Sequence, residues 1–381
     1  MGQSGDVELD DLELAGERLR LRRWHPDDAE RVAGIMRDMS MMQFLALPNP
    51  YTVEDARQFV TELGHEGRGE GSGLGCAVVE QATGRLVGAA ALRMAGDPEI
   101  GFWVAPDSRG HGFAAEATRV LTRFGFSLGL ARIQLDCDVR NLASAATALA
   151  AGFRFEGVAR AAVVSAGRGG IPERSGDLAR FARVSDDPDE PIEPAFPRLT
   201  AGELDDGTLA LRMLLPQDAQ GLGECEDAES VRWNFTGAPR SASQAAATAT
   251  RAGLDWLVGT TARFAMVDVA TGDFAGELNL RRSGPPQIGG VGYTVHPQFR
   301  GRGYTTRALR LVASWTFDRL DLARLELGAK TDNVASQRAA ASAGFTPDGI
   351  RRTRMRNADG SFGDEVRFAL LNPRYSRALH S

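Results

Sequence analysis

The chain contains two copies of one long sequence pattern, and this repeat constrains its fold more than any other feature. Residues 104–160 align with residues 295–352, so that Arg109 matches Arg300 at an offset of 191 residues. Earlier segments match in the same order: LRLRRWHPDDAE at 19–30 with LALRMLLPQDAQ at 209–220, and GRLVGAAALR at 84–93 with GDFAGELNLR at 272–281. Solenoid repeats have periods of about 20 to 50 residues, so this period indicates duplication of a complete domain.

A chain of 381 residues is long enough for two domains, which agrees with the repeat. Between the copies, residues 184–196 are rich in Asp, Glu and Pro, a composition that favours an extended linker over a packed segment. We therefore predict an N-terminal domain over 12–183, a linker over 184–196 and a C-terminal domain over 197–375.

Each copy alternates strand patterns with helix patterns, which predicts an α/β or α+β domain with helices flanking a mixed sheet. In the first copy the expected strands are 19–23, 76–80, 85–93, 100–104 and 133–138. The first expected helix starts at Asp27, and three more are expected at 53–63, 113–128 and 143–151.

A glycine-rich turn precedes a predicted helix in each copy, at 109–114 (RGHGFA) and 300–305 (RGRGYT). Glycines let backbone N–H groups approach a ligand, and a helix N-terminus carries partial positive charge. Together these features predict a diphosphate-binding turn. The Rossmann and P-loop glycine patterns are both absent, which argues against a dinucleotide or nucleoside triphosphate site.

The spacing Arg109, Gly112, Ala114 resembles the [QR]-x-x-G-x-[GA] signature of the GNAT acetyltransferases. Asn141 and Ser144, followed by the Ala-Gly-Phe of 151–153, resemble the N-x-x-S…GF segment of that family. Residues 99–102 (EIGF) and 51–56 (YTVEDA) are similar to the ribosomal-protein N-acetyltransferases of the Rim type. The resemblance implies two GNAT domains, each a mixed, mostly antiparallel twisted sheet flanked by helices, and acetyl-CoA as cofactor.

By this resemblance a set of residues in each copy binds coenzyme A: Val104, Arg109, Gly110, His111, Gly112, Phe113, Ala114 and Asn141, and Val295, Arg300, Gly301, Arg302, Gly303, Tyr304, Thr305 and Asn333. The second set departs from the signature at one position, because Thr305 stands where Gly or Ala is expected. Its amide can still donate a hydrogen bond.

Acetyl transfer to an amine needs a proton acceptor and a proton donor for the leaving thiolate. The resemblance assigns these roles in the first copy to Glu99 and Ser144. A solvated turn carboxylate at Glu99 and a helix-capping role for Ser144 are the structural alternatives. Alanines, Ala148 and Ala340, occupy the positions where many family members carry a catalytic tyrosine.

In the second copy Gly290 replaces the candidate base. Glu277, on the preceding strand, is the substitute we consider, with Ser336 as the acid; an ordinary strand glutamate is the alternative. These differences favour chemistry in the first domain; the alternatives are that both domains are active, or that the chain binds acyl-CoA without catalysis. Candidate walls of the acceptor pocket are Phe44, Leu45, Leu47, Arg232, Trp233 and Phe235.

The acceptor is expected to be an amine of a small molecule or a peptide. A net charge of −6 argues against nucleic-acid binding. The three cysteines lie far apart and predict no metal site, and no apolar run is long enough for a membrane span. We expect a cytoplasmic monomer or homodimer.

Overall fold

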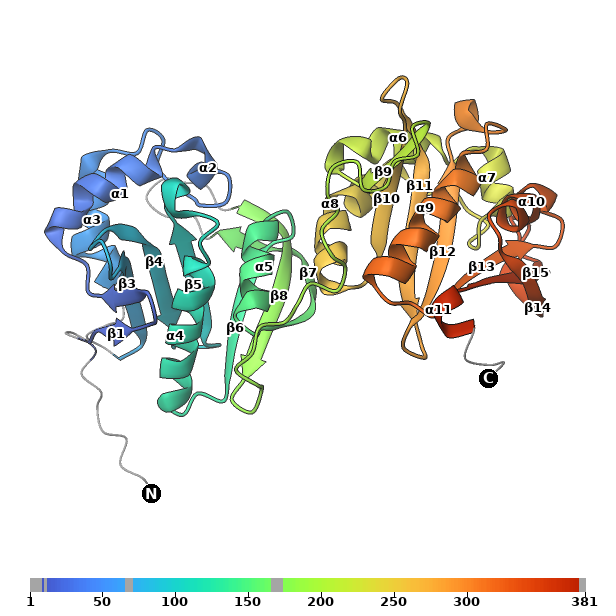
Figure 1. Ribbon diagram of the computed structural model, residues 1–381. Helices are drawn as coiled ribbons and strands as arrows, with labels where there is room; N and C mark the ends of the chain where they lie inside the picture. Colours follow the sequence, from blue (N-terminus) through green and yellow to red (C-terminus); the bar gives the residue numbers. More distant parts are fainter. Residues whose placement is uncertain (1–8, 10–11, 66–70, 166–173, 377–381) are drawn as a thin grey trace. The chain divides into compact units, whose positions relative to one another are not determined.

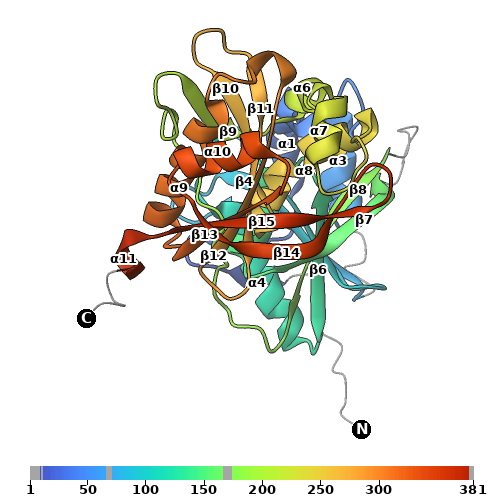
Figure 2. The same ribbon diagram turned by 90° about the vertical axis from the view of Figure 1, so that its right-hand side faces the viewer.

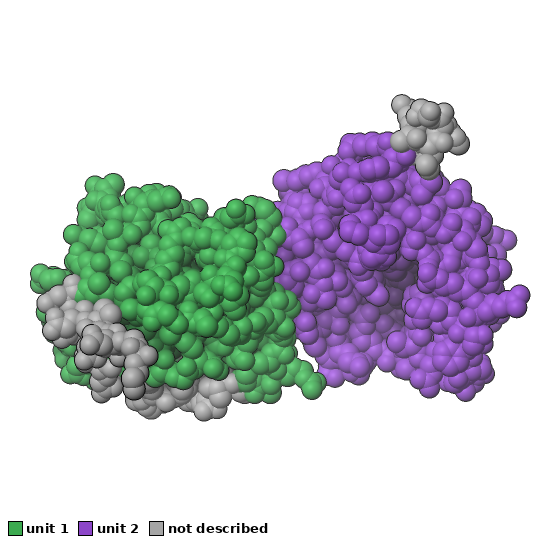
Figure 3. Space-filling model, turned by 90° about the horizontal axis from the view of Figure 1, so that it is seen from below, with its two compact units in different colours: residues 1–193 green, residues 194–381 purple. Residues whose placement is uncertain are grey.

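The computed structural model describes residue 9 and residues 12–65, 71–165 and 174–376. The chain divides after Glu193 into two compact units, residues 1–193 and 194–381 (Figure 3). This division falls inside the segment that we predict to be a linker.

The first unit is built on one sheet with the strand order β1-β2-β3-β4-β5-β6-β8-β7 (Figure 1). Its strands are β1 Leu14–Ala15, β2 Leu19–Arg22, β3 Gly73–Glu80, β4 Leu86–Arg93, β5 Glu99–Val104, β6 Arg132–Asp138, β7 Arg154–Ser165 and β8 Arg174–Val184. Neighbouring strands are antiparallel except for β5 and β6, which run parallel.

The helices of the first unit are η1 Pro26–Asp28, α1 Ala29–Met36, α2 Met39–Met42, α3 Val53–Thr61, η2 Leu63–His65, η3 Pro106–Ser108, α4 Phe113–Ser127 and α5 Leu142–Ala150. Helix α3 begins where its sequence predicts, because Thr52 accepts a hydrogen bond from the amide of Asp55, whose carboxylate in turn accepts from the Thr52 amide. Apolar side chains of α1 and α3, among them Val32 and Val60, pack with Ala77 and Val79 of β3.

The second unit repeats this architecture with the strand order β14-β15-β13-β12-β11-β10-β9. Its strands are β9 Leu209–Met213, β10 Ala262–Asp268, β11 Phe274–Ser283, β12 Ile288–Val295, β13 Arg324–Lys330, β14 Thr346–Arg356 and β15 Phe362–Leu371. Among the strands that the structure describes in this unit, β12 and β13 alone pair in parallel. Figure 2 shows β14 and β15 side by side across this unit.

The helices of the second unit are η4 Pro216–Asp218, α6 Ala219–Glu224, α7 Ala228–Trp233, α8 Ala242–Val258, η5 Pro297–Phe299, α9 Tyr304–Arg319, α10 Val334–Ser342 and α11 Pro373–Ser376. Successive residues of β10 point to opposite faces of the sheet. Phe264 accordingly packs in a cluster with Leu309 of α9, whereas Ala265 packs with Leu222 of α6 and Ala249 of α8. Helices therefore cover both faces, and the predicted fold class is confirmed.

One ion pair recurs at matching positions and fastens the first helical turn of each unit to the strand before it. Both guanidinium nitrogens of Arg22 donate to Asp28 at 2.8 Å, and those of Arg212 donate to Asp218 at 2.7 Å. The Asp218 carboxylate also accepts from the Leu215 amide at 2.8 Å. The carboxylates are buried, whereas the side chains of Arg22 and Arg212 are 15% and 40% exposed, so the two pairs are partly shielded from solvent.

Two features differ from the sequence-based expectation. No strand is predicted after residue 151 of the first copy, yet β7 and β8 form the edge of the sheet there. Phe196, placed at the end of the expected linker, is 1% exposed and packs against Trp256, whose indole N–H donates to the Phe196 carbonyl. The predicted linker includes Phe196 because the residues before it are acidic and rich in proline.

Candidate functional site

The parallel strand pair at the centre of each sheet separates soon after it forms. In the second unit β12 and β13 pair only from Ile288 with Arg324 to Gly290 with Glu326, although both strands continue beyond. In the first unit the corresponding pair has the single register Glu99 with Gln134. In the second unit, residues of both separated strands line a cavity that can hold an extended ligand.

The glycine turn lies at the start of the helix that follows this strand. Gly110 and Gly112 have φ of 79° and 77°, and Gly301 and Gly303 have φ of 73° and 79°. This left-handed conformation is one that side chains disfavour, which explains the glycines. The first amides of α4 and α9 have no partner within their helix, so each turn presents several N–H donors for an anion.

The arginine of the motif is used for structure in both copies. Arg109 donates to the Ser40 hydroxyl of α2 at 2.9 Å, and Arg300 donates to both oxygens of Asp227 at 2.6 and 2.7 Å beside α7. The Arg300 guanidinium holds the pKa of the Asp227 carboxyl well below its usual range. Each arginine therefore fastens the glycine turn to a short helix near the expected acceptor site.

Other predicted cofactor residues also direct their side chains into packing contacts. The His111 ring stacks on Phe113 with 5.6 Å between centroids, and Arg302 lies 5.0 Å over the Phe299 ring. Tyr304 is buried and donates to the Asp268 carboxylate. Because these side chains are occupied, the turn offers a ligand mainly its backbone amides.

The predicted asparagines cap the helices that follow the central strands. The side-chain oxygen of Asn141 accepts from the Ser144 amide at 3.1 Å, and Asn333 does the same for Ser336 at 3.0 Å. Ser144 also interacts with the thiol of Cys137, whose pKa is raised to about 12 by burial. Cys137 is therefore a neutral thiol at physiological pH.

Sequence reasoning missed one polar group, Tyr293 on β12. Its hydroxyl shares a 2.7 Å hydrogen bond with the Ser336 hydroxyl on α10, and burial raises the pKa of Tyr293 above its usual value. The helix position searched for a tyrosine holds Ala340 instead. The signal was present in the strand alignment, where Tyr293 matches Phe102.

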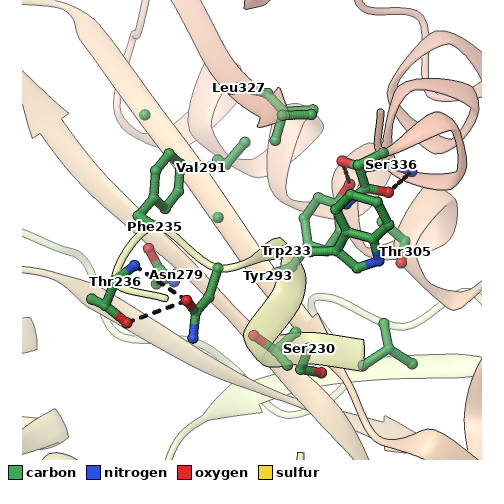
Figure 4. Close-up of a pocket in the computed structure, with 18 of the residues that line it drawn as sticks. Ser230, Trp233, Phe235, Thr236, Asn279, Val291, Tyr293, Thr305, Leu327 and Ser336 are labelled. Atoms are coloured by element: carbon green, nitrogen blue, oxygen red, sulfur yellow. Dashed lines mark hydrogen bonds between the residues drawn. The ribbon is translucent and has the colours of Figure 1, made fainter. Parts of the chain in front are cut away.

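A cavity of about 1570 Å³ opens at the separated strands of the second unit (Figure 4). Its lining joins β12, β13, the turn before α9, the start of α10, and α7. Trp233 of α7 lies beside Thr305, Tyr293 and Ser336, so the cavity connects the glycine turn with these hydroxyl groups. The lining includes Val295, Asn333 and most of the predicted turn residues of this copy.

The two candidate bases have different surroundings. Glu99 forms an ion pair of 2.8 Å with Arg93 and its side chain is 28% exposed, so it remains accessible. Glu277 is 2% exposed, with one oxygen 2.6 Å from Arg263 and the other 3.2 Å from Arg240. Both arginines line the cavity, and Glu277 holds them there.

The predicted pocket walls divide between cavity and core. Trp233 and Phe235 line the cavity, and the Arg232 guanidinium lies 4.5 Å over the Trp233 ring. In the first unit Leu45 and Leu47 pack against the hydrophobic core, and Phe44 is half-buried. No helix of the described residues is long and apolar enough to cross a membrane, and those residues contain no cluster of three or more metal-ligand side chains.

The paired glycine turns, separated central strands and twofold repeat agree with comparison to known proteins. A model of the acetyltransferase (GNAT) domain matches residues 18–154 and again residues 208–346. The chain therefore belongs to the GNAT acetyltransferase family and carries two such domains.

Individual relatives are similar to parts of the chain. A probable N-acetyltransferase of Bacillus subtilis, YjcK, is 36% identical over 90 residues. The match covers 24% of this chain and 49% of YjcK, so this chain spans about half the length of that relative. An uncharacterised N-acetyltransferase of the same organism, YoaA, is 30% identical over 151 residues, 39% of this chain and 85% of the relative. The solved Mycobacterium smegmatis RimJ, in complex with CoA-disulfide, has 21% identity and a TM-score of 0.41, covering 48% of this chain and 92% of RimJ.

Proposed function

We propose that this protein is an acetyl-CoA-dependent N-acetyltransferase that acetylates a primary amine by direct attack on the thioester. The observation that carries the proposal is the separation of β12 from β13 beyond Gly290, together with the N-terminus of α9 at one end of the resulting cavity. The turn amides supply donors for the cofactor diphosphate, and the gap accepts its extended arm. The first unit has the same turn and the same early separation of β5 from β6.

In the first domain, Glu99 is the proposed base and Ser144 the proposed acid. The amine nitrogen forms a bond to the thioester carbonyl carbon as the carbon–sulfur bond breaks. The proton lost by the amine passes to Glu99, directly or through water, and the departing thiolate takes a proton from a hydroxyl group. The partial exposure of Glu99 supports this role, because a base must be reached by the acceptor.

A specific observation favours a second active site in the C-terminal domain. The Tyr293 and Ser336 hydroxyls meet within the cavity, and burial raises the pKa of Tyr293 above its usual value, which is already well above neutral pH. We infer that this pair protonates the leaving thiolate there. Glu277 is the candidate base from sequence, with its carboxylate placed behind Arg240 and Arg263.

Release of free thiol from acetyl-CoA in the presence of a panel of primary amines tests the proposal. Replacing Ala114 or Thr305 by Glu puts a carboxylate on the second residue of α4 or α9, where it favours the helix and repels a diphosphate. Each variant is expected to silence its own domain. Glu99→Gln and Glu277→Gln, separately and together, then test the bases; full activity in the double variant contradicts both roles.

A further inference from the structure

A row of three residues crosses the central strands at the same place in both domains, and its charges differ. In the first domain the register aligns Arg93 of β4, Glu99 of β5 and Gln134 of β6. In the second domain the matching row is Arg281 of β11, Gly290 of β12 and Glu326 of β13. The carboxylate has thus moved to the far strand, and the middle position has no side chain.

This change leaves Arg281 without the carboxylate that its counterpart has. Arg93 lies 2.8 Å from Glu99, whereas the hydrogen bond found for Arg281 goes to the neutral Asn279 at 3.1 Å. Glu326 does not compensate, because it pairs with Arg324 and Arg367. Among the described residues, no carboxylate lies within ion-pair distance of Arg281.

The position above Gly290 is open space within the cavity lining. A Cβ built at Gly290 would contact only the Ser283 hydroxyl, at 3.5 Å, and its φ is not left-handed. Gly290 and Arg281 both line the cavity. The glycine is therefore not demanded by packing or backbone geometry, and its effect is to vacate the space in front of a guanidinium.

The charge of the whole cavity lining also favours an anionic ligand. Lining arginines outnumber lining carboxylates: Arg240, Arg251, Arg263, Arg281, Arg300, Arg354 and Arg367 against Glu229, Asp255, Glu326 and Glu365. Most of these arginines have carboxylate partners. Arg281 and Arg354 are the exceptions among the described pairs, and both are exposed toward solvent.

We propose that the second domain takes an acceptor amine that also bears an anionic group, and that this group occupies the space above Gly290 and pairs with Arg281. The proposal rests on the acetyl-transfer function above and names its acceptor class. A carboxylate and a phosphate share the required chemistry, since either forms charge-assisted hydrogen bonds with a guanidinium. The acceptor thus supplies the charge that Glu99 supplies within the first domain.

The length of strand between the two ends of the site sets the size of the acceptor. Gly290 precedes Tyr293 by three residues, which is about 10 Å along a strand, and this odd spacing puts their side-chain positions on opposite faces of the sheet. Both residues line the cavity where β12 separates from β13, so an acceptor with its amine near the Tyr293–Ser336 pair and its anion above Gly290 extends through this gap and is at least of dipeptide size.

Matched C-terminally amidated dipeptides test this with the full-length protein: Phe-Asp against Phe-Asn, and Phe-phosphoserine against Phe-Ser. Thiol release gives kcat/KM, and calorimetric titration into protein saturated with CoA gives binding without turnover. We expect at least a 10-fold preference for one charged peptide over its neutral partner; the arm that shows it identifies carboxylate or phosphate. Arg281→Gln and Gly290→Glu should abolish the preference.

The controls separate charge from bulk. Gly290→Gln fills the same space without adding charge, so it should displace the acceptor's anionic group and reduce the preference, but by less than Gly290→Glu, which also pairs with Arg281. Arg374→Gln, at an exposed ion pair with Asp318, should leave the preference unchanged. Equal binding of charged and neutral peptides, no binding of either, or a preference that survives in Arg281→Gln, overturns the inference. Charge-dependent binding without any thiol release supports it while contradicting acetyl transfer.

Discussion

The hydroxyl of Tyr293 lies 2.7 Å from that of Ser336, and the two residues come from β12 and α10 on either side of the gap between the central strands. The first domain cannot form this pair, because Phe102 matches Tyr293. The two halves of the chain therefore differ in their proton donors as well as in their carboxylates.

Tyr293→Phe tests the proton-donor role in the second domain. In the Ala114→Glu background, we expect kcat to fall by about 100-fold with little change in KM, because a general acid acts in the transition state. Phe102→Tyr, the matched change in the first domain, should not lower that domain's rate when it is measured in the Thr305→Glu background. Unchanged kcat in Tyr293→Phe would exclude the tyrosine as donor.

The same tyrosine gives a pH prediction. Burial raises its pKa above the ordinary value of about 10, so the phenol stays protonated throughout the neutral and mildly alkaline range. The second-site rate is therefore expected to show no loss up to about pH 9.5 attributable to this group. A decline that appears near pH 8 and disappears in Tyr293→Phe would contradict this assignment.

The ion pair of Arg212 with the buried Asp218 carboxylate gives a stability prediction for the second domain. Asp218→Ala removes two bonds to Arg212 and the acceptor for the Leu215 amide, and is expected to destabilise the domain by about 2 to 3 kcal/mol. Asp318→Ala, at an exposed ion pair, should cost at most about 0.5 kcal/mol. Urea unfolding followed by tryptophan fluorescence measures the free energy of unfolding of both variants. Equal losses in Asp218→Ala and Asp318→Ala would show that the Arg212–Asp218 pair stabilises the domain no more than an exposed pair does.

The Arg300–Asp227 pair should make stability depend on acid pH. The pKa of Asp227 is lowered in the folded state, so its contribution is complete above the unfolded value of about 3.9 and is lost as pH falls further. Asp227→Asn should therefore cost about 0.5 to 1 kcal/mol at pH 7, a small effect because the pair is partly solvated. Urea titrations should show this difference narrowing below about pH 4; a difference that widens there would contradict it.

The sequence predicted the repeat and the fold class because whole-domain duplication and helix–strand alternation are visible in residue order. Thr52 marked the start of α3 through a local capping interaction, which depends only on neighbouring residues. The hairpin of β7 and β8 and the burial of Phe196 depend on partners distant in the chain, and local patterns do not encode such partners.

The site was predictable to the same extent. The two turns can be recognised in the sequence by their glycines, which have positive φ in the structure, because few other residues adopt that conformation. The pairing of Glu277 with two arginines and the meeting of Tyr293 with Ser336 arise from cross-strand and strand–helix contacts. That Arg281 has no carboxylate partner among the described residues likewise cannot be inferred without the strand register.

Calorimetric titration of the full-length protein with coenzyme A tests the central claim most directly, because both proposed sites depend on the amides of the two glycine turns. The account predicts two binding sites in the unmodified chain, one site in Ala114→Glu or Thr305→Glu, and none in the double variant. An unmodified, folded chain that shows no affinity for coenzyme A, or a double variant that still binds two equivalents, would contradict it.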